Sequence, residues 1–191
     1  MSQKSLTRIT EYAKLLMKET LKPGDLAVDA TMGNGKDTLF LAKLVGETGK
    51  VLAFDIQLEA LHNTTKRLKE NKVDLSSVSL IHDGHQNIDQ YIEGEIISGA
   101  MFNLGYLPGG DRNIVTKPET TIISLQKCLD CLKKNGLITI VVYHAHMGGQ
   151  EEKEKVLSFV KQLERERYHV LKIDFMNQRE DSPFLIAIIK K

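Results

Sequence analysis

The feature that most constrains the fold of this sequence is a regular alternation of short apolar runs with longer segments of helical periodicity. The apolar runs read as strands, and the segments with apolar residues three or four positions apart read as helices. The predicted strands are residues 26–30, 51–55, 78–81, 100–103, 137–143, 170–174 and 184–189. The predicted helices are residues 5–21, 36–45, 58–71, 118–134 and 150–167.

The predicted strands are continuous apolar runs, which is typical of a parallel sheet covered by helices on both faces. Residues 175–183 are too short for a crossover helix, so we expect the seventh strand to run antiparallel to the sixth. A seven-stranded, mostly parallel sheet with an antiparallel last strand is the layout of the Rossmann-like class I methyltransferases. We therefore predict an α/β fold with one domain over residues 1–191. Its N-terminal helix, within residues 1–22, is expected to pack on the core.

Length and composition agree with one domain that has a core, because 41% of the 191 residues are hydrophobic and single domains commonly have this length. No apolar run approaches the ~18 residues of a membrane helix, and the N-terminus M-S-Q-K-S-L-T-R lacks a signal-peptide core. We therefore expect a cytoplasmic protein without membrane association. The formal net charge of +1 neither requires nor excludes a nucleic-acid partner.

The two cysteines of the chain, Cys128 and Cys131, have the C-x-x-C spacing of redox and zinc sites. Leucines at 125, 129 and 132 place them in the middle of a predicted helix, and no second Cys or His pair completes a tetrahedral zinc site. We expect buried helical cysteines and no metal site.

Acidic residues end three of the predicted strands, at the edge where ligands bind in sheets of this kind. Asp29 precedes the turn T-M-G-N-G, whose Gly33 and Gly35 permit close backbone approach and lead into a helix N-terminus. Asp55, at the end of the second strand, can accept hydrogen bonds from both hydroxyls of a ribose. Asp83, at the end of the third strand, can accept from the exocyclic amine of an adenine.

This pattern favours S-adenosylmethionine over a dinucleotide. The dinucleotide fingerprint needs a third glycine, and position 38 is Thr. The carboxylate of Asp29 would also repel a pyrophosphate, whereas it could hold the amino-acid moiety of S-adenosylmethionine. An NAD oxidoreductase is therefore disfavoured. Two alternatives remain. The protein could be a nucleotide-binding module without activity, or the three aspartates could only cap strands or helices.

The loop after the fourth predicted strand, reading F-N-L-G-Y-L-P-G-G-D, carries more polar chemistry than a connector needs. Amine-directed methyltransferases have N-P-P-Y or D-P-P-Y in this place. An amine must point its lone pair along the S–CH3 axis, and the side-chain oxygen of Asn103 or the carbonyl of Leu104 could orient its N–H groups. Tyr106 could stack on a flat base. Turn chemistry alone is the simpler alternative.

An alkylamine is largely protonated near pH 7, so its methylation needs a proton acceptor. Asp111, His144 and His146 are the candidates, and the sequence does not choose among them; the two histidines could equally belong to a polar loop. RNA phosphates or splayed bases could be contacted by Arg112 and Lys117 and by Arg179 in the last hairpin. Scattered surface charge explains these basic residues equally well.

Four segments, D-A-T-M-G-N-G-K-D-T, F-D-I-Q, H-D-G-H and F-N-L-G-Y-L-P-G-G-D, together resemble the small Gram-positive S-adenosylmethionine-dependent methylases labelled rRNA methylase. Members of that family, of the MnmM type, methylate the 5-aminomethyl group of 2-thiouridine at the wobble position 34 of tRNA. The resemblance covers nearly the whole chain. Thr31 departs from the general class I pattern, which has a glycine there.

The resemblance implies a tRNA methyltransferase that binds an anticodon stem-loop and forms a homodimer; methylation of rRNA or of a small-molecule amine is the alternative. It implies catalytic roles for Asn103, Tyr106 and Asp111. The substrate-binding residues would be Tyr106, Arg112, Lys117, His144 and Arg179. The cofactor-binding residues would be Asp29, Thr31, Gly33, Asn34, Gly35, Asp37, Thr38, Asp55, Gln57, Asp83, His85 and Asn103.

Overall fold

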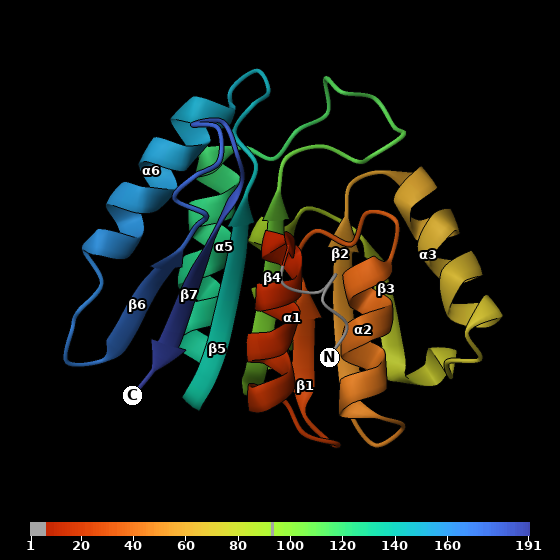
Figure 1. Cartoon of the computed structure of the whole chain (residues 1–191). Coiled ribbons are helices and arrows are strands. Elements are labelled where there is room, and N and C mark those ends of the chain that lie inside the picture. Colours follow the sequence, from red (N-terminus) through yellow and green to blue (C-terminus); the bar gives the residue numbers. More distant parts are fainter. Residues whose placement is uncertain (1–6, 93) are drawn as a thin grey trace.

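The computed structural model describes residues 7–92 and 94–191 as a central sheet with helices on both faces (Figure 1). The helices are α1 Ile9–Thr20, α2 Lys36–Val45, α3 Leu58–Glu70, α4 Asp89–Ile92, α5 Pro118–Cys131 and α6 Gly149–Lys161, with 3-10 turns η2 Leu75–Ser77 and η3 His85–Asn87. The strands are β1 Leu26–Asp29, β2 Lys50–Asp55, β3 Val78–His82, β4 Ile97–Leu104, β5 Leu132–Val142, β6 Tyr168–Ile173 and β7 Phe184–Lys190.

The strand order is β3-β2-β1-β4-β5-β7-β6. Strands β1 to β5 are paired in parallel, and β7 runs antiparallel to both β5 and β6. The predicted α/β class and the antiparallel last strand are therefore confirmed. The order reverses beside β1, so the loops after β1 and β4 diverge at the carboxyl edge of the sheet, where open α/β sheets bind ligands.

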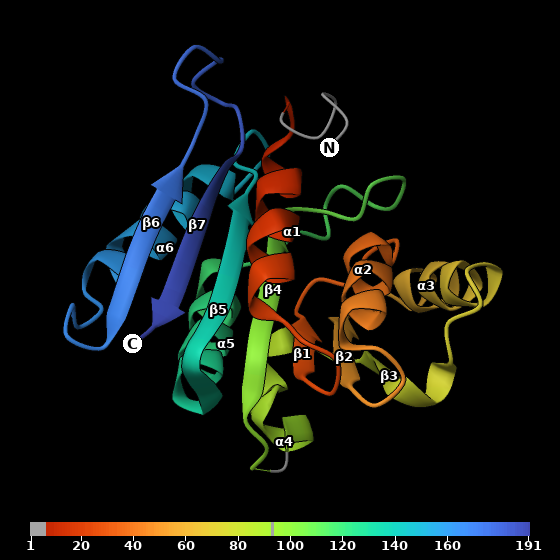
Figure 2. The same ribbon diagram turned by 60° about the horizontal axis from the view of Figure 1, so that its bottom comes forward.

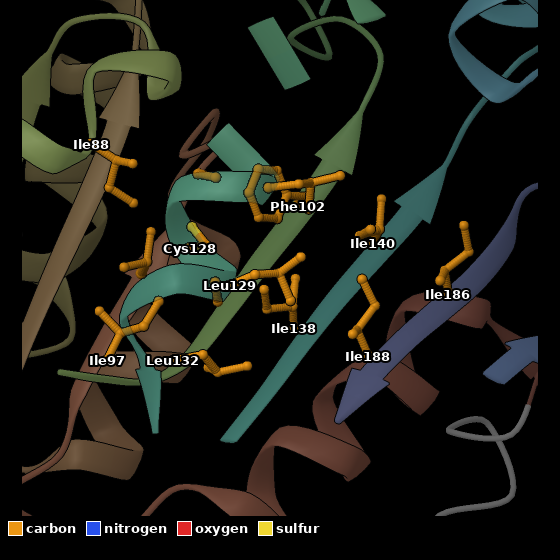
Figure 3. Packing of buried hydrophobic residues seen from close by; sticks show 14 of the residues in the cluster. Ile88, Ile97, Phe102, Cys128, Leu129, Leu132, Ile138, Ile140, Ile186 and Ile188 are labelled. Carbon is orange, nitrogen blue, oxygen red and sulfur yellow. The ribbon is translucent and has the colours of Figure 1, made fainter. Parts of the chain in front are cut away.

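Two apolar clusters lie on the two faces of the sheet and hold the helices there. One joins α1, α2 and α3 to the sheet through residues such as Met17, Leu41 and Leu68. The other joins α4, α5 and α6 to the opposite face and contains Phe102 and Leu129 (Figure 3). Burial on both faces explains why β1, β4 and the end of β5 consist mainly of apolar residues and do not alternate with polar ones.

Helix α1 lies against β4, β5 and β7, beside α2 on the same face of the sheet (Figures 1 and 2). Its buried residues Ile9, Ala13 and Met17 share one helical face. The predicted helix began at residue 5; the structure begins it at Ile9, and residues 5 and 6 lie outside the described residues. None of the helices in the described part of the chain has the length and apolarity needed to cross a bilayer.

Several predicted boundaries differ from the structure, including the ends of α5 and α6 and the start of β5. Helix α5 ends at Cys131 instead of residue 134, because Leu132 pairs with Ile97 and already belongs to β5. The predicted stop at residues 135–136 is a bulge inside β5, with Asn135 at φ +61°. Helix α6 ends at Lys161 instead of residue 167, since the charged residues 164–167 are exposed and have no core to cover.

The outermost strand β6 departs from the buried pattern, because Val170 and Leu171 are exposed. It pairs only with β7 and forms the edge of the sheet. The two cysteines are helical, as predicted, but they lie in the last turn of α5 and only Cys128 is buried, whereas Cys131 is half-buried. Burial raises the pKa of the Cys128 thiol far above its usual range, so this sulfur is an inert part of the core.

Candidate functional site

A cavity of about 670 Å³ opens at the carboxyl edge of the sheet, within the usual size range of small-molecule sites. Loops after β1, β2, β3 and β4 line it, and α1 and Tyr143 after β5 complete the wall. The loop after β4 rises above this edge beside the loop after β5 (Figure 1). The predicted cofactor edge and the predicted substrate loop therefore border one cavity.

Asp55 and Gly33 form the first polar pair of the cavity wall. Gly33 has φ +51°, and its amide donates to Asp55 Oδ2 at 2.9 Å. The amide of Gln57 donates to Asp55 Oδ1 at 3.0 Å. Burial raises the pKa of Asp55, and these backbone hydrogen bonds partly offset that effect. Each carboxylate oxygen keeps a lone pair, so Asp55 can still accept from two ligand hydroxyls.

The far end of the cavity combines Asp83 with an exposed apolar side chain. Ile56 lines the cavity and is 56% exposed, which offers a flat ligand an apolar face. Asp83 accepts from the Gly84 amide, the Asn87 side chain and the Tyr91 hydroxyl. Burial alone would raise the Asp83 pKa, but these hydrogen bonds outweigh it and hold the pKa below its usual range. Asp83 is therefore an ionised acceptor.

Asp29 is not among the residues that line the cavity, although the sequence predicts a contact with the amino-acid end of a cofactor. Its side chain is fully buried and accepts from the Thr31 amide at 3.2 Å and the Thr38 hydroxyl at 2.6 Å. Thr38 is likewise buried and does not line the cavity. The β1 strand points its last side chain inward, so Asp29 and Thr38 fix the turn that the ligand-facing residues occupy.

Replacing Asp29 with Asn is expected to change how stability depends on pH. Burial, with the nearby charge of Asp37, raises the pKa of Asp29 from 3.8 to about 7. Because the pKa of Asp29 is higher in the folded state, the folded protein binds a proton at Asp29 more tightly than the unfolded chain does. The resulting contribution to the free energy of unfolding is complete below pH 3.8 and is lost as pH rises towards 7. The loss corresponds to about 4 kcal/mol.

The Asp29→Asn variant keeps a neutral side chain at all pH values, so its unfolding free energy relative to wild type should rise between pH 4 and 7. Urea unfolding of both proteins at several pH values measures this difference. A constant difference across the range would contradict the assignment of a raised pKa to Asp29.

Gly35 is also absent from the cavity wall. It has φ +71°, and a Cβ there would lie 2.6 Å from Thr64 Oγ1 and 2.9 Å from Thr64 Cα. The glycine therefore permits α2 and α3 to approach each other, whereas the prediction had assigned the close approach to a ligand. Between the two glycines, Asn34 lines the cavity and donates to the Pro108 carbonyl at 2.9 Å. This bond joins the loop after β1 to the loop after β4.

Asn103 is the last residue but one of β4, lines the cavity and is held by two neighbours. Its amide N–H donates to Thr31 Oγ1 at 2.7 Å, and its side-chain Nδ2 donates to Asp37 Oδ2 at 2.7 Å. Thr31 thus supplies an acceptor that a glycine could not, which gives a physical reason for the departure from the class I pattern. Asp37 lines the cavity from the first turn of α2.

Tyr106 stands at the cavity mouth and is 39% exposed. The Arg112 guanidinium lies 5.8 Å from its ring centroid, and the His146 ring meets it edge-on at 6.1 Å. Gly105 and Thr116 brace the loop from below, because each amide donates to an oxygen of the other residue. The ring is therefore held at the mouth with part of its surface free.

A buried carboxylate supports this loop from behind. Glu152 on α6 is 1% exposed and accepts from the hydroxyls of Thr116 at 2.7 Å and Thr121 at 2.8 Å. Burial raises its pKa, and the two hydroxyls partly offset that effect. Through Thr116 the carboxylate fixes the segment that carries Tyr106. No pattern in the sequence had indicated this contact between α6 and the loop.

Several predicted site residues do not line the cavity. Asp111 is exposed and accepts from the backbone and side chain of Asn113, so it caps a turn. His144 is buried with Nε2 at the Glu180 carbonyl and its ring against Phe184. His146, the third candidate proton acceptor, is also not among the lining residues, although its ring contacts Tyr106 at the cavity mouth.

Of the three basic residues predicted to contact RNA, one lines the cavity and two do not. Lys117 lines the cavity, whereas Arg112 lies outside it over Tyr106. Arg179 pairs with Asp181 in the exposed last hairpin and is not part of the cavity wall. The predicted cofactor residues that do line the cavity are Thr31, Gly33, Asn34, Asp37, Asp55, Gln57, Asp83, His85 and Asn103.

The sequence interpretation missed the contribution of the N-terminal helix to the cavity. Arg8, Glu11 and Lys14 line it, and Tyr143 does so from the end of β5. Helical periodicity indicated which residues of α1 face the core, but it carried no information about which strand ends the polar face would reach. That position follows only from the packing of α1 across β4 and β5.

The strand order, the antiparallel β7 and an acid-lined cavity beside the switch point define the Rossmann-like class I methyltransferase fold. Residues 51–189 match the model of the family described as "Putative rRNA methylase". An Arabidopsis thaliana protein named tRNA (mnm(5)s(2)U34)-methyltransferase, chloroplastic, is 35% identical over 96% of this chain and 70% of its own length. The chain belongs to this family of methylases.

Two solved structures extend the similarity. A Clostridium thermocellum protein with the same rRNA-methylase description is 47% identical, with a TM-score of 0.93 over 97% of this chain and 98% of its own. A Streptococcus mutans protein described as a "putative methyltransferase" in complex with SAH is 40% identical, with a TM-score of 0.89 over 97% and 99% of the two chains.

Proposed function

We propose that this protein is an S-adenosylmethionine-dependent tRNA methyltransferase that methylates the 5-aminomethyl nitrogen of the wobble uridine. The observation that carries the proposal is the meeting of Asn103 and Tyr106 with an acid-lined cavity at one sheet edge. The name of the Arabidopsis relative supports the tRNA target, and the SAH in the Streptococcus mutans structure supports the cofactor. Residues 1–191 would act as one domain that includes the N-terminal helix.

The cavity residues fit S-adenosylmethionine, which supplies an activated methyl group when bound. Asp55 would accept from the ribose hydroxyls, because its two oxygens accept from the Gly33 and Gln57 amides and each oxygen can accept more than one hydrogen bond. Ile56 offers an apolar face for the adenine, and Asp83 offers an ionised acceptor for its exocyclic amine. The turn at residues 31–34, fixed by Asp29, would close over the amino-acid end.

Asn103 would act on the amine, since Oδ1 is the acceptor that remains when Nδ2 donates to Asp37. The Leu104 carbonyl already accepts from the Tyr143 amide at 3.3 Å and keeps a second lone pair for the same amine. Together the two oxygens would turn the nitrogen lone pair towards the methyl group. Orientation of this kind supplies a large part of the acceleration in a transfer between two bound reactants.

The RNA would enter at the cavity mouth. The free surface of the Tyr106 ring would stack on the thiouracil, and the Arg112 guanidinium beside it would contact an adjacent base or phosphate. Lys117 in the cavity wall would pair with a phosphate of the anticodon stem-loop. We include in the proposal a cytoplasmic location, which is an expectation from the sequence, and a homodimeric state, which the family resemblance implies.

The proposal predicts that a strain without this gene accumulates the 5-aminomethyl form of 2-thiouridine in its tRNA and lacks the methylaminomethyl form. Mass spectrometry of tRNA nucleosides, with and without the gene, measures the ratio. Complementation with the Asn103→Ala gene serves as the inactive control. An unchanged ratio, or transfer of labelled methyl to separated rRNA instead of tRNA, would overturn the proposal.

A further inference from the structure

Three side chains from different elements form a line that ends at Asn103. Lys14 Nζ on α1 lies 3.4 Å from Asp37 Oδ1 on α2, and Asp37 Oδ2 accepts from Asn103 Nδ2 at 2.7 Å. All three residues line the cavity. The line is largely shielded from solvent, because the side chains of Lys14 and Asp37 are 23% and 12% exposed.

The carboxylate of Asp37 fixes the orientation of the Asn103 amide, because it binds Nδ2 and leaves Oδ1 directed to the ligand. An ionised carboxylate only accepts hydrogen bonds, so it can bind Nδ2 but not Oδ1. Among the residues that the structure describes, Oδ1 has no hydrogen-bond donor of its own. Without a charged Asp37, the amide could rotate by half a turn and present its N–H groups. It would then repel the N–H groups of an amine.

Lys14 is the cation that balances Asp37. Asp37 also faces buried Asp29, so an unpaired negative charge at position 37 would be unfavourable whenever Asp29 is ionised. Lys14 further contacts Glu11 at 3.6 Å and the Phe40 ring at 5.7 Å. The docking of α1 does not depend on Lys14, because Ile9, Ala13 and Met17 supply its buried face.

We propose that Lys14 and Asp37 are positioning residues, which hold the Asn103 amide with Oδ1 directed to the amine that is methylated. This inference rests on the proposed function. It adds that the fixed Oδ1 of Asn103 favours a substrate whose nitrogen carries N–H groups, such as an amine. The N-terminal helix thereby becomes part of the site as well as of the core.

Steady-state kinetics with tRNA that carries the 5-aminomethyl group test the proposal. Lys14→Met should lower kcat about 10-fold and Asp37→Asn about 100-fold, the range found when orienting partners are removed. The KM for tRNA and the Kd for SAH should stay within about two-fold of wild type. Lys14→Arg restores the cation and should keep kcat within about three-fold.

Lys18→Met is the matched control, because Lys18 lies one turn further along α1 and is exposed. It should behave as wild type. A rise in the KM for tRNA with unchanged kcat would assign Lys14 to phosphate binding, and a rise in the Kd for SAH would assign it to the cofactor. Either result overturns the positioning role.

Nuclear magnetic resonance of the Asn103 side chain separates this inference from the proposed function. With 15N-labelled asparagine, the Asn103 amide pair is assigned by its disappearance in Asn103→Ala. One of its protons should resonate downfield in wild type and in Lys18→Met, and should shift upfield in Asp37→Asn and Lys14→Met. If wild type shows this signal but does not methylate the tRNA, the proposed function fails and the arrangement stands. If the signal is the same in all variants, the inference fails.

Discussion

Asn103→Ala is expected to lower kcat for tRNA methylation by about 10²- to 10³-fold, with the Kd for SAH within about two-fold of wild type. In the proposed function, the Asn103 side-chain oxygen would accept from the amine, because Nδ2 of the same amide donates to Asp37. Its loss removes an interaction that acts in the transition state and leaves the Asp55 and Asp83 contacts in place. Calorimetry with SAH and single-turnover kinetics measure the two quantities separately.

The matched control is Asn113→Ala, an exposed asparagine of the same loop that bonds only to Asp111 among its described partners. It should retain wild-type kcat. Turnover of Asn103→Ala within about three-fold of wild type would remove the role proposed for this residue. A Kd for SAH that rises as steeply as kcat falls would instead show that Asn103 mainly supports cofactor binding.

Asp55→Ala is expected to weaken SAH binding by at least about 10²-fold. Two hydrogen bonds from ribose hydroxyls to a carboxylate would be lost, each with a contribution of about 1.5–3 kcal/mol. The Gly33 amide also loses the acceptor that fixes the turn after β1. Because saturating cofactor compensates for lost affinity, kcat should fall less than kcat/KM for the cofactor.

Asp111→Ala removes a carboxylate that lies outside the cavity, so it is the control for Asp55→Ala. It should bind SAH as wild type does and should keep its turnover, which also tests the corrected position of Asp111. Thermal unfolding of both variants checks that the fold is retained. An Asp55→Ala protein that is folded and binds SAH with wild-type affinity would contradict the assignment of the ribose site.

Much of the fold follows from local properties of the sequence. Residues 51–54 and 184–189 are apolar, as expected for inner strands of a sheet that is covered on both faces. The errors occurred where a boundary depended on a distant partner. Leu132 belongs to β5 because Ile97 lies beside it, and no signal within α5 marks that pairing.

The site was predicted in part, and the errors have a common cause. Asp55, Asp83, Asn103 and Tyr106 line the cavity, since residues at or just beyond the carboxyl end of a parallel strand reach this edge. Asp29 ends a strand as well, but its carboxylate is enclosed by its own turn. The place of a residue after a predicted strand shows at which edge of the sheet it lies. Whether its side chain points into the cavity depends on the surrounding packing.

The sequence by itself determined the alternation of strands and helices, the antiparallel last strand and the placement of acids at one edge, because periodicity and turn chemistry are local. Only the tertiary structure decided which of these residues meet. Lys14, Asp37 and Asn103 are far apart in the chain and come together through the packing of α1 and α2 on the sheet. Their hydrogen bond and ion pair act over a few ångströms in space, so no spacing in the sequence records them.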